Sequence, residues 1–188
     1  MSIARTYTSA EVGRLLKNSE GTGLTRERGA GHAEGLHAIG AAGRGRDSTT
    51  TVGLEERLID ERKAKVGAFD NCQVDAITAA LNTQAGQNSL RHLAVSTVWY
   101  VFVKISIQHG NFQMAMSESD LPANRASGPM TKPQTRSCQA LFVAMKLMKD
   151  DKGELHIRTA FPLDAAPANG ASCSVTYRGA GQPQSLAI

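Results

Sequence analysis

Two histidines stand in a glycine-rich stretch of the chain and could move protons near neutral pH. The segment Gly31-His32-Ala33-Glu34-Gly35-Leu36-His37 places them five residues apart, with one carboxylate between them. Because the imidazole of histidine has a reference pKa of about 6.5, it can both accept and donate a proton near neutrality. The segment could therefore serve acid–base catalysis, or it could be a loop with two exposed histidines.

A metal site is the second chemistry that this segment could carry. His32, Glu34 and His37 are of the types that bind zinc, so a metal-dependent hydrolase is an alternative. On a helix, positions five apart point about 140° away from each other, which is poor geometry for chelation. The sequence therefore predicts no metal and no cofactor.

The predicted strand Leu155–Phe161 is the other segment with chemical potential. Strand side chains alternate between two faces, which predicts that Ile157, Thr159 and Phe161 share one face and that Arg158 lies on the opposite one. A threonine between apolar neighbours points into the interior or a cleft, or it is simply a residue that favours strands.

Positive charge is concentrated in the second half of the chain. The net charge is +4, and the segment from Arg91 to Lys149 alone holds seven basic and two acidic residues. This surplus fits a surface that attracts phosphate. It also fits solvated strand edges, where lysine discourages aggregation.

The elements that must position these residues fall into a helical first half and a strand-rich second half. Hydrophobic spacing predicts helices over 9–16, 52–65 and 71–82 and a short helical piece after 86. Thr8 or Ser9 would cap the first helix, and Asp70 with Gln73 would cap the third. Leu54, Leu58 and Ile59 would form the buried face of the second helix.

Alternating and β-branched residues predict five strands, over 95–107, 112–116, 138–148, 155–161 and 172–177. The third could instead be a helix. Gly110-Asn111 would turn the first strand into the second, Pro162 would end the fourth, and residues 179–188 would be a frayed tail.

These elements predict an α+β fold in which N-terminal helices pack on a C-terminal antiparallel sheet. A length of 188 residues fits a single domain over 1–188, with a core over about 11–178. The longest apolar run, Val98–Val103, is far shorter than the roughly 20 residues of a membrane span, so none is expected. No secretory signal is visible, so any export would depend on something outside the given chain.

Several short motifs, in this order, resemble the RNase A-like toxin domain of CdiA-type contact-dependent growth inhibition proteins. The similarity covers roughly residues 15–165. Gly31–Ala38 is similar to the family's Gly-His…Arg-His-Val segment, Leu54–Leu58 to its helix ending in Arg-Leu, Gly67–Asp70 to its Ser-Thr-Phe-x-Asp turn, Ala80–Asn82 to its Ala-Leu-Asn helix, and Thr159–Pro162 to its final Thr-Ala-Tyr-Pro strand.

The resemblance implies an RNase A-like fold and a catalytic set of His37, Arg57 and Thr159, with His32 as a further candidate. Phe161 stands where the family carries tyrosine, and Leu36 where it carries arginine. We expect substrate to contact the residues Phe161, Lys146 and Arg158.

The activity implied is that of a metal-independent endoribonuclease toxin, with tRNA as one candidate substrate. RNA supplies its own 2′-hydroxyl nucleophile, so the enzyme only has to move protons and stabilise the phosphorane, giving a 2′,3′-cyclic phosphate. His32, His109 or His156 would be the second proton carrier. A catalytically degenerate RNA- or protein-binding module on the same fold is the alternative.

The resemblance also implies partners and a place of action. We expect a cognate immunity protein, acidic where this domain is basic, that blocks the cleft. The domain would be a monomer when free and would act in the cytoplasm of a target bacterium.

Overall fold

The chain forms four helices and eight strands over the residues that the computed structural model describes, which are 3–20, 37–40, 51–60, 63–118, 134–168, 170–179 and 182–186. The helices are α1 (Ser9–Ser19), α3 (Thr51–Asp60), α4 (Gln73–Asn82) and α5 (Gln84–Ala94). The strands are β1 (Lys65–Phe69), β2 (Val98–Ser106), β3 (Gln113–Glu118), β4 (Gln134–Gln139), β5 (Phe142–Lys149), β6 (Leu155–Leu163), β7 (Ser172–Tyr177) and β8 (Gln184–Leu186). The predicted α+β class is confirmed. None of the helices just named is long and apolar enough to cross a membrane.

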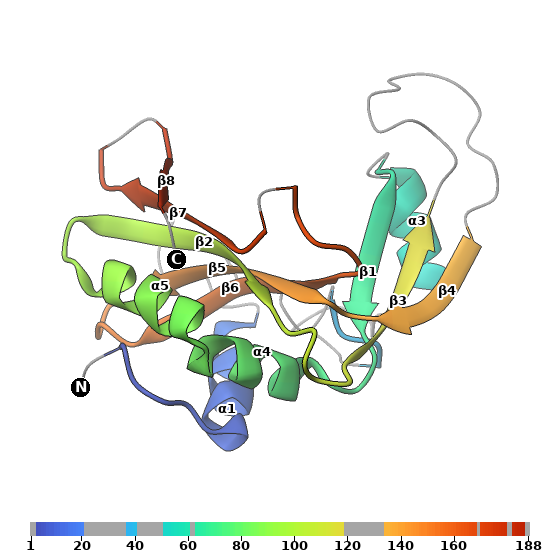
Figure 1. Cartoon of the computed structure of the whole chain (residues 1–188), viewed down its shortest axis with the longest axis horizontal. Helices are drawn as coiled ribbons and strands as arrows, with labels where there is room; N and C mark the ends of the chain where they lie inside the picture. Colours follow the sequence, from blue (N-terminus) through green and yellow to red (C-terminus); the bar gives the residue numbers. More distant parts are fainter. Residues whose placement is uncertain are drawn as a thin grey trace.

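The strands form two antiparallel sheets that meet near the middle of the molecule (Figure 1). The larger sheet has the order β6-β5-β2-β7-β8 and the smaller one the order β1-β3-β4. The prediction that β3 returns along β2 was wrong, because β3 pairs with β1 and β4 instead. Strands β1 and β6 are therefore the edge strands at which the two sheets approach each other.

The predicted strand over 138–148 is two strands that belong to different sheets. It breaks at Ala140 and Leu141, whose N–H groups donate to Phe112 and to Leu163 respectively, both at 2.8 Å. The chain thus leaves the smaller sheet at Gln139 and enters the larger one at Phe142. This crossing joins the two sheets covalently beside β6.

Helix α1 begins at the predicted cap and is three residues longer than predicted. The Thr8 hydroxyl accepts from the Glu11 N–H at 3.3 Å, and the Glu11 carboxylate accepts from the Thr8 N–H at 2.8 Å. This reciprocal pair satisfies two backbone donors that a helix start leaves open. Arg5 donates to the same carboxylate at 2.7 Å.

The cap makes part of the stability of the fold depend on pH. Hydrogen bonds from the Thr8 backbone, and then from Arg5, lower the pKa of Glu11 from 4.5 to about 2. Because this pKa is lower in the folded state, ionised Glu11 stabilises the fold above about pH 4.5, and the gain is lost as the pH falls toward 2. Glu11→Gln keeps an acceptor but removes the charge, so its deficit in unfolding free energy relative to wild type should shrink over this window. Urea unfolding at a series of pH values measures it, and a constant deficit would contradict the assignment.

Helix α4 begins differently from the prediction. Its N-cap is Cys72, which makes no capping hydrogen bond through its side chain, so the predicted capping box of Asp70 and Gln73 was wrong. The Asp70 N–H instead donates to Gln113 at 3.0 Å and continues the pairing of β1 with β3. Asn71, at a φ of 53°, then turns the chain into the helix.

The break after α4 lies at Thr83 and not at Gly86. The Thr83 hydroxyl accepts from the Gly86 N–H at 3.0 Å and caps α5. A side chain at Gly86 would collide with the carbonyl oxygens of Ala80 and Leu81, so glycine is needed here for close packing of the two helices.

The predicted helix over 52–65 is shorter in the structure. Helix α3 ends at Asp60, and Lys65 already belongs to β1. Leu54 and Leu58 are buried as predicted, but Ile59 is 44% exposed, so its assignment to the buried face was wrong.

Three further differences concern the larger sheet. Pro162 does not end β6 but pairs with Val143 inside it, which the sheet tolerates because β6 is an edge strand. A bulge at Arg158 shifts the register of β6 against β5. The predicted tail contains β8, which pairs with β7.

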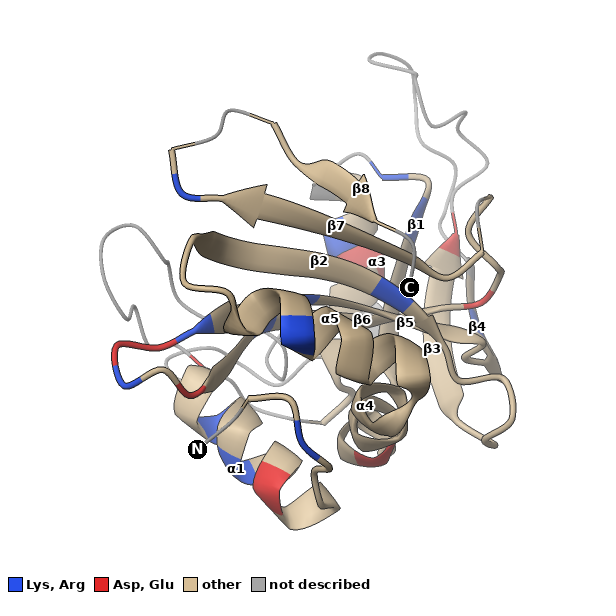
Figure 2. Cartoon of the chain, turned by 60° about the vertical axis from the view of Figure 1, so that its left-hand side comes forward, with Lys and Arg blue, Asp and Glu red and all other residues tan. Residues whose placement is uncertain are grey.

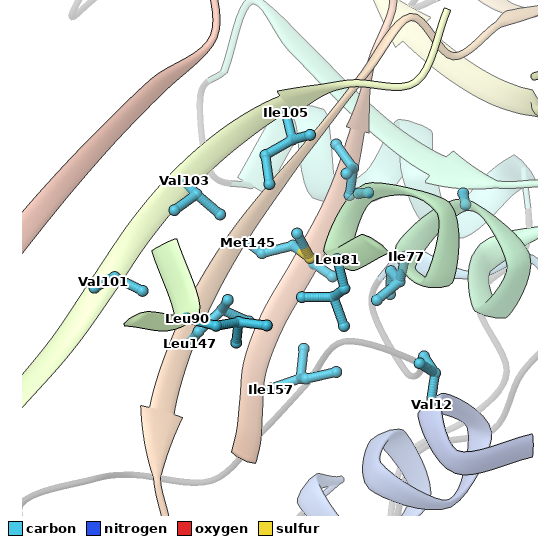
Figure 3. Packing of buried hydrophobic residues seen from close by; sticks show 14 of the residues in the cluster. Val12, Ile77, Leu81, Leu90, Val101, Val103, Ile105, Met145, Leu147 and Ile157 are labelled. Atoms are coloured by element: carbon cyan, nitrogen blue, oxygen red, sulfur yellow. The ribbon is translucent and has the colours of Figure 1, made fainter. Parts of the chain in front are cut away.

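One large core unites helices α1, α4 and α5 with strands of the larger sheet (Figure 3). Val12, Ile77, Leu81 and Leu90 from the helices are buried in the same cluster as Met145 of β5. A second, smaller core joins Leu54 and Leu58 of α3 to β1 and β3. Each sheet therefore has its own helical support.

Candidate active site

A cavity of about 450 Å³ lies between the edge strands β1 and β6, where the two sheets meet. This volume is within the range of roughly 300–1,000 Å³ that is typical of ligand sites. Side chains of α3, β1, β3 and β6 line it, together with His37. The lining therefore includes residues of both hydrophobic cores, such as Met114 of the large core and Val66 of the small one.

His37 is held against β1 by backbone pairing. Ala38 forms an isolated parallel bridge with Phe69, and the Ile39 N–H donates to the Phe69 carbonyl at 2.8 Å. The imidazole is 8% exposed, and its Nδ1 lies 3.4 Å from the Gly67 carbonyl oxygen. Because a carbonyl can only accept, this hydrogen bond requires the proton on Nδ1 and leaves the lone pair of a neutral ring on Nε2. In this tautomer Nε2 is the proton acceptor.

Gly67 lies where β1 passes both the end of the Met114 side chain and β6. A Cβ at this position would lie 2.6 Å from the methyl end of Met114 and 3.6 Å from the Pro162 carbonyl oxygen. A side chain here would therefore displace the end of Met114, which lines the cavity, but would not collide with β6.

Arg57 reaches the cavity from the last turn of α3. Leu54 and Leu58, buried on either side of it in the helix, fix α3 against β1 and β3. Lys63 and Lys65 add two more cations to the lining, whereas Asp164 is the one acidic residue in its described part. The cavity is therefore suited to an anionic ligand.

Four charged side chains form a network at the rim of the cavity. Lys65 lies 2.6 Å from Glu118 and 3.3 Å from Asp164, and Arg136 lies 3.2 Å from each of these carboxylates. The hydrogen bond with Glu118 is the main reason that the pKa of Lys65 is raised, so Lys65 stays cationic. The network ties β1, β3 and β4 to the end of β6 and positions the Lys65 ammonium.

Thr159 faces the cavity because of the bulge in β6. Thr159 pairs with Lys146 and Ile157 pairs with the next residue of β5, so Arg158 is the extra residue between them. Ile157 lies in the core, and Arg158 lies near Lys146 on the side that Thr159 faces. The predicted division of faces was therefore wrong for both Ile157 and Arg158. The Thr159 hydroxyl is buried and has no hydrogen-bond partner among the described residues. Such a group costs about 1–3 kcal/mol unless a ligand satisfies it.

Two aromatic rings extend the wall from His37 along the sheet. The Phe161 ring lies 5.3 Å from the His37 ring, measured between centroids and tilted by 39°. Phe102 of β2 lies 6.4 Å from Phe161 on its other side. The rings support the imidazole and offer apolar surface next to the cations.

The structure therefore brings together four residues that the sequence predicted from distant segments, namely His37, Arg57, Thr159 and Phe161. No protein-family model, curated protein or solved structure matches the chain.

The other predicted residues lie elsewhere. Lys146 and Arg158 are on the strands beside Thr159 but do not line the cavity. His109 is exposed in the turn after β2, and His156 is buried in β6, both away from the lining. His32, and with it Glu34 of the metal alternative, lies outside the described residues.

Sequence reasoning missed Lys63, Lys65, Gly67 and Asp164 as residues of the site. Lys65 was assigned to the end of a helix, and Asp164 follows the proline that was expected to end β6. No local pattern marks them, because only the pairing of β1 with β3 and the approach of β6 bring them to the cavity. The spacing of Lys65 and Gly67 by two residues fits one face of a strand, but glycine does not favour strands, so the pattern did not predict β1.

Proposed function

We propose that this domain is an endoribonuclease that cleaves RNA by attack of the 2′-hydroxyl and needs no metal for the step. One observation carries the proposal: His37, Arg57 and Thr159 line the same cavity. A proton acceptor, a fixed cation and a hydroxyl donor are three of the groups that assist transesterification at a phosphodiester.

Each residue takes the role that its geometry supports. Nε2 of His37 accepts the proton of the 2′-hydroxyl while Nδ1 stays bonded to Gly67. The 2′-oxygen then bonds to phosphorus, and the bond to the 5′-oxygen breaks, which leaves a 2′,3′-cyclic phosphate. Arg57 stabilises the charge on the phosphorane, and the Thr159 hydroxyl donates to a nonbridging oxygen.

The second proton transfer, to the leaving 5′-oxygen, needs its own donor. His109 and His156 do not line the cavity, which argues against both. His32 is the third candidate and lies outside the described residues. Phe161 has no hydroxyl to offer.

An RNase A-like toxin arrangement belongs to the same proposal. The α+β fold with antiparallel sheets and the cationic cavity support it. Delivery by a larger protein, action in the target-cell cytoplasm and inhibition by an acidic immunity protein follow from the proposed toxin role. A binding module without catalysis is the second candidate, favoured by the phenylalanine at position 161.

Cleavage of RNA in the presence of excess EDTA tests the proposal. We expect the rate to be unchanged by the chelator and the product to end in a 2′,3′-cyclic phosphate, detected by mass spectrometry. The matched control is the same oligonucleotide with 2′-deoxyribose throughout, which should resist cutting because it has no internal nucleophile. Loss of cutting in EDTA, or cutting of the deoxy substrate, would exclude this mechanism, and binding without any cutting would favour the module.

A further inference from the structure

The larger sheet has one face that turns away from the core, here called the outer face. Val101, Val103 and Ile105 of β2 are in the core that the helices share, so the residues between them point to the other side. The outer face is defined by five partly exposed side chains, Tyr100, Phe102, Lys104, Lys146 and Arg158. In Figure 1 helices α1, α4 and α5 all lie on the opposite side of this sheet.

The five strands of this sheet carry no acidic residue. The whole chain has 17 aspartates and glutamates, yet none falls within β2, β5, β6, β7 or β8. Lys104, Lys146 and Arg158 of the same strands lie on the outer face, whereas Lys149 donates to the Val95 carbonyl after α5 on the other side. Strand β2 is drawn in Figure 2 with a blue segment and no red one. Such a one-signed surface is suited to a polyanion.

Strand register connects the outer face to the cavity. Thr159 pairs with Lys146, Lys146 with Phe102, and Phe102 with Ser174, which forms one row across four strands. Side chains paired directly across antiparallel strands have Cβ atoms about 4.5–5.5 Å apart. The row therefore begins at the proposed catalytic threonine and continues away from it as a cation, an aromatic ring and a hydroxyl.

Two cations of the outer face, Lys146 and Arg158, are near enough for their charges to repel, and the strands of this sheet hold no acidic residue. The Lys146 ammonium lies 3.7 Å from the centre of the Tyr100 ring. Burial lowers the pKa of Lys146, the neighbouring Tyr100 opposes this, and the charge of Arg158 lowers it further. A bound phosphate would relieve the repulsion between the two cations.

Unsatisfied hydroxyls lie on the same face. In the described part of the chain, the buried hydroxyls that lack a hydrogen-bond partner are those of Ser106, Thr159 and Thr176. All three alternate with core residues of their strands and therefore point to the outer face. A buried polar group without a protein partner calls for an explanation, and an ordered water or a bound polar ligand would supply one.

We propose that single-stranded RNA binds across the outer face, with the scissile phosphate in the cavity and the neighbouring nucleotides along the row from Thr159 to Phe102. The inference rests on the proposed ribonuclease function and adds the substrate class. Lys104, Lys146 and Arg158 contact phosphates, and Phe102 stacks on a base. In a duplex the bases are paired and stacked on each other, so only a single strand can offer them to the sheet.

Binding to a fluorescein-labelled single-stranded RNA of mixed sequence, followed by anisotropy, tests the inference. The His37→Ala protein serves as the parent so that the RNA is not cut. In this background Lys104→Gln/Lys146→Gln should make the negative slope of log K against log salt shallower by about 1.4, because each lost phosphate contact removes about 0.7. Phe102→Leu should weaken binding about tenfold at all salt concentrations. The matched control is Lys17→Gln/Lys152→Gln, which removes two exposed cations outside this face and should leave the slope unchanged.

The outcomes separate this inference from the proposed function. If wild type cuts RNA but the outer-face variants bind like the parent, the inference is wrong and the ribonuclease stands. If the variants lose binding but wild type cuts nothing, the ribonuclease fails and the face is an RNA-binding surface. Tighter binding of the same RNA annealed to its complement would overturn the single-stranded assignment. A polyglutamate peptide that competes as well as RNA would assign the face to an acidic protein instead.

Discussion

Replacement of His37 by alanine should lower the rate of RNA cleavage by about 10²–10⁴-fold, which is the usual contribution of a general acid or base. His37 is the one imidazole among the described cavity residues. Its Nδ1 is bonded to a backbone carbonyl, so the ring can present Nε2 to the substrate. Single-turnover cleavage of a labelled RNA with enzyme in excess measures the chemical step directly.

Two controls distinguish a catalytic role for His37 from a structural one. His37→Gln fills most of the space beside Phe161 and keeps a donor for Gly67, but it cannot accept a proton, so it should be as slow as the alanine variant. His109→Ala removes an exposed imidazole outside the cavity and should cut like wild type. Near-normal cutting by His37→Gln, with an unchanged Tm, would remove His37 from the chemistry.

The predictions of the first helix and of the last strand came from local signals. Thr8 and Glu11 form the capping box at the expected place, and Ser172–Tyr177 is a strand with the predicted limits. In each case the residues that determine the element are its own neighbours in sequence. Capping and alternation therefore identified these elements without knowledge of the fold.

Elements whose stability comes from distant contacts were predicted poorly. Strand β1 contains Gly67 and Ala68, which do not favour strands, and it forms because β3 pairs with it and α3 covers it. The run over 138–148 shows nothing at Ala140 to indicate a change of sheet, since the break exists only through hydrogen bonds to Phe112 and Leu163. The strand or helix propensity of a residue depends on its local sequence and does not reveal partners that are distant in the chain.

In the candidate site, too, residues in local motifs were predicted and residues placed by distant contacts were not. His37, Arg57, Thr159 and Phe161 were found through short motifs whose order in the chain resembles that of a toxin family, and they line one cavity. The supporting lysines were not found, because no motif contains them. The bulge at Arg158 also escaped prediction, although it decides that Thr159 faces the cavity while Ile157 faces the core.

Thr159→Val should separate catalysis from stability, with opposite effects on the two. Valine keeps the branched shape that suits a strand and removes a buried hydroxyl that has no partner among the described residues. We therefore expect the free energy of unfolding to stay the same or rise by about 1 kcal/mol. RNA cleavage should nevertheless fall by about 10²–10³-fold, as for other lost donors to a developing charge.

The comparison with two further variants makes this result specific to the hydroxyl. Thr159→Ser keeps the donor and should retain most of the activity, although it loses a methyl group from the packing against β5. Thr78→Val removes a hydroxyl that donates to Val74 within α4, outside the cavity, and should leave cleavage unchanged. Full activity in Thr159→Val would mean that the residue only shapes the strand. Loss of activity together with increased stability would instead show that the hydroxyl lowers the stability of the free protein. This is expected of a group whose hydrogen-bond partner is the phosphate of the substrate.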